Sequence, residues 1–214
     1  MAEVKDKRKY SSVVREEQAA RTRTRILDAA SDLFLEHGYA RTTMKDIAAQ
    51  ADVARDTVHA IFGSKARVLT ALIDQRLVPD DSVANVTQRP DALAIRDEVD
   101  QRQQIELFAR FIAGISTELR PVFEILRTAS AVEPEMAKVF EEMDRFRLKN
   151  MQTYARWIAA RGSLRVSTRR AGEMIWALAS LDVARMLCDE IGWTESQHAR
   201  WLADTLIRTL LPDD

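Results

Sequence analysis

The sequence is poor in the residues that interrupt helices and in those that most often carry catalysis. Its 214 residues include six glycines, five prolines, three histidines and one cysteine. So few glycines and prolines leave little room for the frequent turns of an all-β protein. The lone Cys188 cannot form an intramolecular disulfide, and no Cys or His stands near it at metal-ligand spacing. With scattered histidines and no glycine-rich phosphate loop, the sequence argues against an enzyme, and we expect no catalytic residues, cofactor or metal.

Long apolar runs are also missing. No stretch of about eighteen uncharged apolar residues occurs, and the opening MAEVKDKRKY lacks the apolar core of a signal peptide. We therefore expect a cytoplasmic protein without a membrane partner.

The net charge is close to zero, but the basic residues are unevenly placed. The whole chain carries a formal charge of -1, whereas residues 1–25 contain eight Lys or Arg and only four Asp or Glu. Residues 1–15 have almost no apolar content to bury, so we expect them to form a basic, disordered arm. The sequence leaves open what this arm contacts.

What the chain does contain is helical periodicity. Hydrophobic residues make up 46% of the sequence and charged residues 30%, and apolar positions recur every three or four residues. This pattern predicts an all-α fold with a first domain over 16–63 and a larger second domain over 64–214. The predicted helices are 16–37, 44–50, 54–61, 64–77, 100–117, 121–129, 134–161, 167–191 and 194–211, and residues 79–94 are predicted to be a loop.

Two of these helices form the most informative pattern. Helices 44–50 and 54–61 are short, are joined by the turn Ala51-Asp52-Val53, and are braced by a longer preceding helix. This is the arrangement of a DNA-binding helix-turn-helix, whose second helix enters the major groove. A structural helical hairpin would explain the apolar positions equally well, but not the cluster of hydrogen-bonding side chains on so short a helix.

The segment from Arg23 to Leu72 resembles the tetracycline-repressor-like (TetR) family of bacterial regulators. The resemblance is carried by ILDAASDLF, then GY, then TTMKDIAAQA, then VARDTVHAIF, then GSK. The C-terminal GWTESQHARWLADTLIRTLL also looks like the last helix of many members. The resemblance implies an N-terminal helix-turn-helix domain and a larger C-terminal domain for ligand binding and dimerisation. It further implies a homodimeric repressor that releases a palindromic operator on binding an apolar or aromatic small molecule.

Three positions depart from the family pattern. Asp52 stands where the family turn usually has Gly, Ala54 where a capping Ser or Thr is common, and His59 where a Tyr is usual. Asp tolerates the left-handed conformation better than most residues, so we expect the turn to survive.

The resemblance and the residue types together give three sets of candidate site residues. Contacts to double-stranded operator DNA are expected from Thr43, Lys45, Arg55, Asp56, Thr57, His59 and Lys65, with Arg55 and Thr57 reading base edges and Thr43 and Lys65 holding phosphates. A small-molecule effector is expected among Phe108, Phe111, Phe123, Arg127, Phe140, Met143, Arg147 and Trp176. A dimer interface is expected at Trp193, Trp201, Leu202, Leu206 and Leu210.

Alternatives remain for several of these residues. A stripe of Met and aromatic side chains at helical spacing is more often core than pocket, and Arg127 and Arg147 fit a surface position as well as a pocket. A DNA-binding scaffold without any ligand also fits the sequence. The effector, the operator, the regulated genes and the choice between repressor and activator are not given by the sequence.

Overall fold

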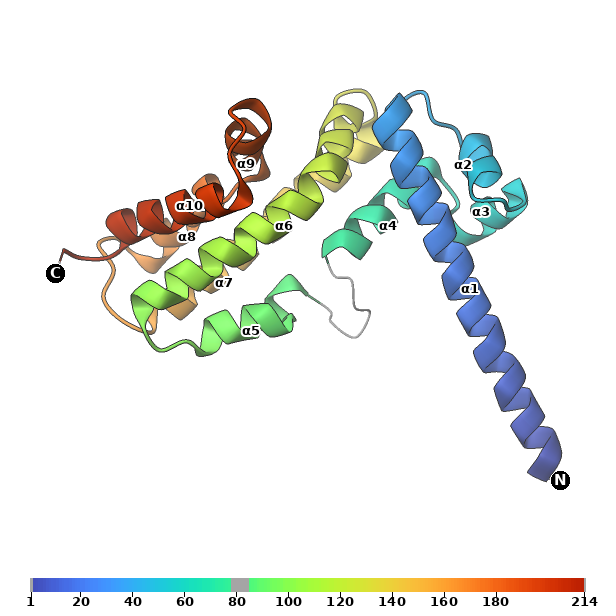
Figure 1. The fold of residues 1–214 in the computed structure, drawn as a ribbon, viewed down its shortest axis with the longest axis horizontal. Helices are drawn as coiled ribbons and strands as arrows, with labels where there is room; N and C mark the ends of the chain where they lie inside the picture. Colours follow the sequence, from blue (N-terminus) through green and yellow to red (C-terminus); the bar gives the residue numbers. More distant parts are fainter. Residues whose placement is uncertain (1, 78–84, 214) are drawn as a thin grey trace. The chain divides into compact units, whose positions relative to one another are not determined.

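A computed structural model describes residues 2–77 and 85–213, with side chains from residue 17 onward except that of Leu77. Every regular element in those two ranges is helical, which confirms the all-α prediction (Figure 1). The chain divides into two compact units, residues 1–72 and 73–214. The division falls inside a helix, later than the boundary predicted at 63/64.

The first unit is built from α1 (Ala2–His37), α2 (Met44–Gln50), α3 (Arg55–Phe62) and the start of α4 (Lys65–Leu77). Its core consists of side chains that are almost completely buried, among them Ile26, Phe34, Ile47, Val58 and Leu69. Gly38 follows α1 with a φ of 77°, a left-handed conformation that suits glycine and ends the helix.

Helix α1 is longer than the sequence predicted. It begins at Ala2, whereas its start was expected near Glu16 after a disordered arm over 1–15. The side chains of residues 1–16 lie outside the described part of the structure, so the contacts of this basic segment remain a prediction.

The second unit contains η1 (Val86–Gln88), α5 (Pro90–Asp97), α6 (Gln101–Ser130), α7 (Pro134–Ala159), α8 (Thr168–Leu178), α9 (Leu181–Arg185), the π-helical turn η2 (Met186–Glu190) and α10 (Glu195–Leu210). The long helices α6 and α7 pack together, with α8 against α7 and α10 against α6 (Figure 1). None of the helices in the described ranges is long and apolar enough to cross a membrane.

Three predictions about this unit were wrong. Helix α6 continues through Pro121, where a break was expected, because Leu119 and Val122 on either side are buried and their packing outweighs the backbone hydrogen bond that proline removes. The predicted helix 167–191 stops at Leu178 and restarts after Ser180, whose hydroxyl accepts a hydrogen bond from Val183 N at 3.1 Å. Residues 79–84 of the predicted loop 79–94 lie outside the described residues, and the rest contains η1 and the start of α5, which forms because it buries Ala92 and Ile95.

Candidate functional site

The start of α2 is fixed by a reciprocal capping box. The Thr43 hydroxyl donates to Asp46 Oδ2 at 2.7 Å and accepts from the Asp46 backbone N–H at 3.2 Å, and the Thr43 backbone N–H donates to the same carboxylate at 3.0 Å. These hydrogen bonds hold the pKa of Asp46 below its usual value. The hydroxyl hydrogen of Thr43 is therefore engaged within the chain, and a phosphate at this place would compete with Asp46 for it.

The turn between α2 and α3 is held by a residue from α1. Asp52 has a φ of 52°, the left-handed conformation that the sequence predicted for it. The Arg25 guanidinium donates to the backbone oxygens of Ala51 and Asp52, the latter at 2.9 Å, and lies 3.7 Å from the Asp52 carboxylate. Arg25 thus ties the turn to α1, a role that sequence reasoning missed because it counted Arg25 only within the basic excess.

Helix α3 presents a polar face opposite a buried one. Val58 and Phe62 are buried, while Arg55, Asp56 and His59 are exposed. Thr57 is half-buried, and Lys45 is exposed on α2. The polar residues predicted for α3 are therefore displayed on a helix whose opposite side is anchored in the core.

The ring of His59 is oriented by the end of its own helix. Its Nδ1 lies 3.2 Å from the backbone oxygen of Gly63, a contact that requires a hydrogen on Nδ1. The neutral ring then has only an acceptor at Nε2, and a contact to a phosphate oxygen needs the protonated ring.

Lys65 makes contacts inside the first unit. Its ammonium donates to the backbone oxygen of Tyr39 at 2.8 Å and lies 4.1 Å from the centroid of the Tyr39 ring. This joins the start of α4 to the segment between α1 and α2. The structure therefore gives Lys65 a role in holding these elements together, in addition to the phosphate contact expected from the sequence.

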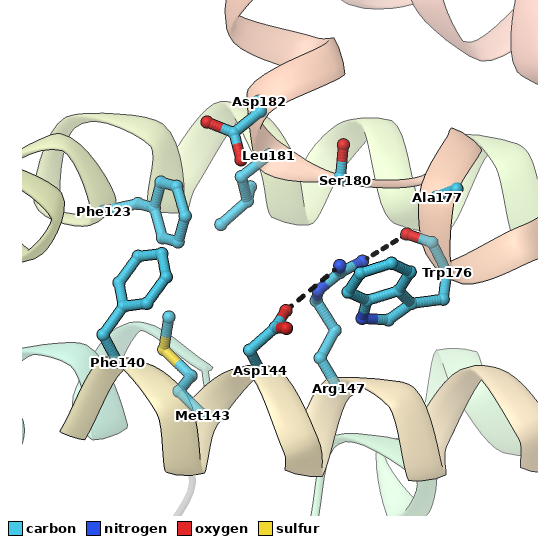
Figure 2. Close-up of a pocket in the computed structure, with 10 residues that line it drawn as sticks. All are labelled: Phe123, Phe140, Met143, Asp144, Arg147, Trp176, Ala177, Ser180, Leu181 and Asp182. Atoms are coloured by element: carbon cyan, nitrogen blue, oxygen red, sulfur yellow. Dashed lines mark hydrogen bonds and ion pairs between the residues drawn. The ribbon is translucent and has the colours of Figure 1, made fainter. Parts of the chain in front are cut away.

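The second unit contains a cavity of about 350 Å³ between α6, α7, α8 and the start of α9 (Figure 2). Five of the eight residues predicted to contact an effector line it, namely Phe123, Phe140, Met143, Arg147 and Trp176. The other lining residues are Asp144, Ala177, Ser180, Leu181 and Asp182. Sequence reasoning missed these because several lie at the break between α8 and α9, where a continuous helix was expected.

One wall of the cavity is a fixed polar group. The Arg147 guanidinium donates to the backbone oxygen of Trp176 at 2.7 Å and to Asp144 at 3.3 Å, and it lies 4.8 Å from the Trp176 ring centroid (Figure 2). Burial lowers the pKa of Arg147, and the nearby Asp144 carboxylate partly offsets this. Arg147 thus connects α7 to the end of α8.

Three predicted effector residues lie elsewhere. Phe108 is fully buried in the core of the second unit, with its ring centroid 4.7 Å from that of Tyr154, and Phe111 packs on the same cluster. Arg127 pairs with Glu124 on its own helix at 2.5 Å. These three residues do not line the cavity.

Comparison with known proteins agrees with this architecture. Residues 26–72, which include the turn and α3, match the family model described as bacterial regulatory proteins, tetR family. This segment is therefore of the TetR type. TtgR of Pseudomonas putida is 29% identical over 131 residues, 59% of each chain, and the repressor BepR of Brucella suis is 29% identical over 178 residues, 82% of this chain and 79% of BepR. The matches to TtgR and to ArpR of P. putida span less than two thirds of either relative, 59% and 37%. A solved SmeT–triclosan complex is 25% identical with a TM-score of 0.64, covering 90% of this chain and 93% of that one.

The expected TetR-type dimer contacts need correction. Leu202, Leu206 and Leu210 on α10 are fully buried in the core of their own chain, because the apolar stripe of α10 packs against α6. They are therefore not available to a partner chain. Trp193 and Trp201 are only half-buried, with ring centroids 6.3 Å apart, and stay candidates for an interface.

Proposed function

We propose that this chain is a ligand-responsive, DNA-binding transcriptional regulator of the TetR family. In this proposal a homodimer represses by binding a palindromic operator, and it releases the operator when an apolar or aromatic small molecule binds. The observation that carries the proposal is the exposed polar face of α3, formed by Arg55, Asp56 and His59 over the buried Val58 and Phe62.

The chemistry of that face suits the edges of base pairs. An arginine at the start of a recognition helix can donate two hydrogen bonds to guanine in the major groove, and exposed lysines such as Lys45 neutralise phosphates. A pair of such helices related by a two-fold axis reads two half-sites about one helical turn of DNA apart, which is why we propose a dimer and a palindrome.

The similar proteins support both the proposed repression and the proposed binding of a small molecule. BepR is described as a transcriptional repressor, and SmeT has been solved with the small molecule triclosan. The cavity lined by Phe123, Phe140 and Trp176 offers this chain a place for a small molecule.

The two activities are proposed to communicate through α4. This single helix contains residues of both compact units, since the division falls between Leu72 and Ile73. A ligand that favours one arrangement of the second unit then changes the half-site spacing of the dimer. Thermodynamic reciprocity requires that a ligand which weakens operator binding also binds the DNA-bound dimer more weakly by the same factor.

The decisive experiment is selection of bound sequences from random DNA, followed by affinity measurements on the selected site. We expect a palindrome, and Arg55→Ala is expected to cost about 1–3 kcal/mol and to relax the preference at one base position per half-site. Arg169→Ala is the matched control, because Arg169 is an exposed arginine of the second unit. If Arg55→Ala binds every selected sequence as the control does, α3 is not the reading helix.

A further inference from the structure

The cavity of the second unit carries more negative than positive charge. Its charged lining residues are Asp144, Asp182 and Arg147. Arg147 is already paired with Asp144 at 3.3 Å and bound to the backbone oxygen of Trp176 at 2.7 Å. The Asp182 carboxylate therefore has no partner among the charged residues that line the cavity.

Asp182 has no ion pair within residues 17–76 and 85–213. The Asp182 carboxylate interacts electrostatically with Arg147 and Arg127 and favours the charged form of each arginine. Both arginines are paired with another carboxylate, Asp144 at 3.3 Å and Glu124 at 2.5 Å. Neither arginine is left to neutralise Asp182.

Three of the six apolar residues that line the cavity are aromatic. Phe123 and Phe140 lie with centroids 5.5 Å apart, and Figure 2 shows them at the opposite end of the cavity from Arg147 and Trp176. The negative face of an aromatic ring attracts a cation, and rings also stack on a flat apolar ligand. A carboxylate beside such rings is complementary to a molecule that combines a ring with a positive charge.

We propose that the cavity binds an aromatic organic cation, whose ammonium group pairs with Asp182 while its ring packs against Phe123 and Phe140. This inference rests on the proposed effector site and names its ligand class. A volume of about 350 Å³ is at the lower end of small-molecule sites, which limits the ligand to one or two rings. Asp182 is exposed, so a neutral ligand would gain no attraction from its carboxylate, and an anion would be repelled by it.

Three probes of similar shape and different charge test this inference. Phenyltrimethylammonium is the cation, tert-butylbenzene replaces its nitrogen with carbon, and benzenesulfonate is the anion. Binding to the full-length protein is measured by equilibrium dialysis at fixed ionic strength. We expect the cation to bind at least about tenfold more tightly than the neutral probe, and the anion to bind most weakly.

Variants of Asp182 show whether this carboxylate is the cause. Asp182→Asn keeps the shape and is expected to remove the preference for the cation, whereas Asp182→Glu is expected to keep it. Asp204→Asn is the matched control, because it removes one exposed carboxylate of α10 outside the cavity lining. Thermal melting verifies that each variant is folded, since Asp182 lies in the first turn of α9.

The outcomes separate this inference from the proposed function. Equal binding of the three probes, no binding of any probe, or a preference that persists in Asp182→Asn overturns the cation site. If the wild-type protein nevertheless binds its selected operator, the regulator proposal stands and only the ligand class is wrong. If the cation binds as expected and no operator is found, the site stands and the DNA-binding proposal fails.

Discussion

Replacing Arg25 tests whether the turn of the helix-turn-helix depends on a contact from α1. Arg25→Ala removes the donor that reaches the backbone oxygens of Ala51 and Asp52. The turn already holds Asp52 in the left-handed conformation, which is costly for a residue other than glycine. We therefore expect the variant to have a less ordered turn between α2 and α3.

The magnitude follows from the burial of the two acceptors. Ala51 is buried, with 4% of its surface exposed, so its carbonyl loses its donor in a place that water reaches poorly. A buried acceptor left without a partner costs about 1–3 kcal/mol. Because 51% of the Arg25 side chain is exposed and Asp52 is open to solvent, we expect the lower part of that range, about 1–2 kcal/mol. For a chain of this size this corresponds to a decrease of about 2–8 °C in melting temperature.

The assay compares Arg25→Ala with Arg21→Ala by thermal melting and by operator affinity. Arg21 is an exposed arginine one turn earlier on α1, so both variants lose the same charge from the same helix. We expect operator affinity to decrease by up to about tenfold more in Arg25→Ala, because binding must then also order the turn. If the two variants melt and bind alike, the contact of Arg25 with the turn contributes nothing and the reasoning is refuted.

Three further predictions concern packing, pH and the basic segment. A Cβ at Gly172 would lie 2.9 Å from a side-chain carbon and 3.0 Å from a backbone carbon of α7. Gly172→Ala is therefore expected to lower the free energy of unfolding, measured in urea, by about 1–3 kcal/mol. The control Gly114→Ala is expected to be neutral or stabilising, because a Cβ at Gly114 has no neighbour within 4 Å. Burial lowers the pKa of His198 in the folded chain, so the unfolded chain binds a proton more readily. The melting temperature is therefore expected to be highest above pH 6.5 and to decrease as the pH falls from there toward the pKa of His198 in the folded chain. His198→Gln is expected to flatten this dependence on pH. Deleting residues 2–10 is expected to weaken DNA binding at low salt without changing the melting temperature; equal affinity at every salt concentration would show that the segment is only a tail.

Sequence reasoning succeeded where the local residues decide the structure. The left-handed conformation of Asp52 follows from the tolerance of Asp for it. The predicted helix starts near 44, 167 and 194 are confirmed, because Thr43, Ser167 and Thr194 accept hydrogen bonds from nearby backbone N–H groups. Sequence reasoning failed at Pro121, where burial of the flanking residues outweighs the local preference for a break.

The cavity was predicted only in part, for a similar reason. Phe108 and Phe123 lie about four turns apart on α6, close to the same face, and periodicity treats them alike. Only the packing separates them, because Phe108 meets Tyr154 in the core while Phe123 meets Phe140 beside the break before Ser180. No pattern in the sequence showed that break, so the residues around it, including Asp182, were not predicted to contact an effector.

Two sets of basic residues in the first unit differ in the contacts that they make within the chain. In the first set, Arg23 lies over the Phe62 ring, Arg25 donates to the carbonyls of the turn, and Lys65 donates to the backbone oxygen of Tyr39. Their charges therefore also stabilise the fold. Lys45 and Arg55 are exposed side chains of α2 and α3. A cation that neutralises a phosphate releases a counterion, so replacing Lys45 is expected to lower the slope of affinity against salt by about one. Replacing a residue of the first set instead changes the melting temperature together with affinity, which means that affinity alone does not identify a DNA contact in this domain.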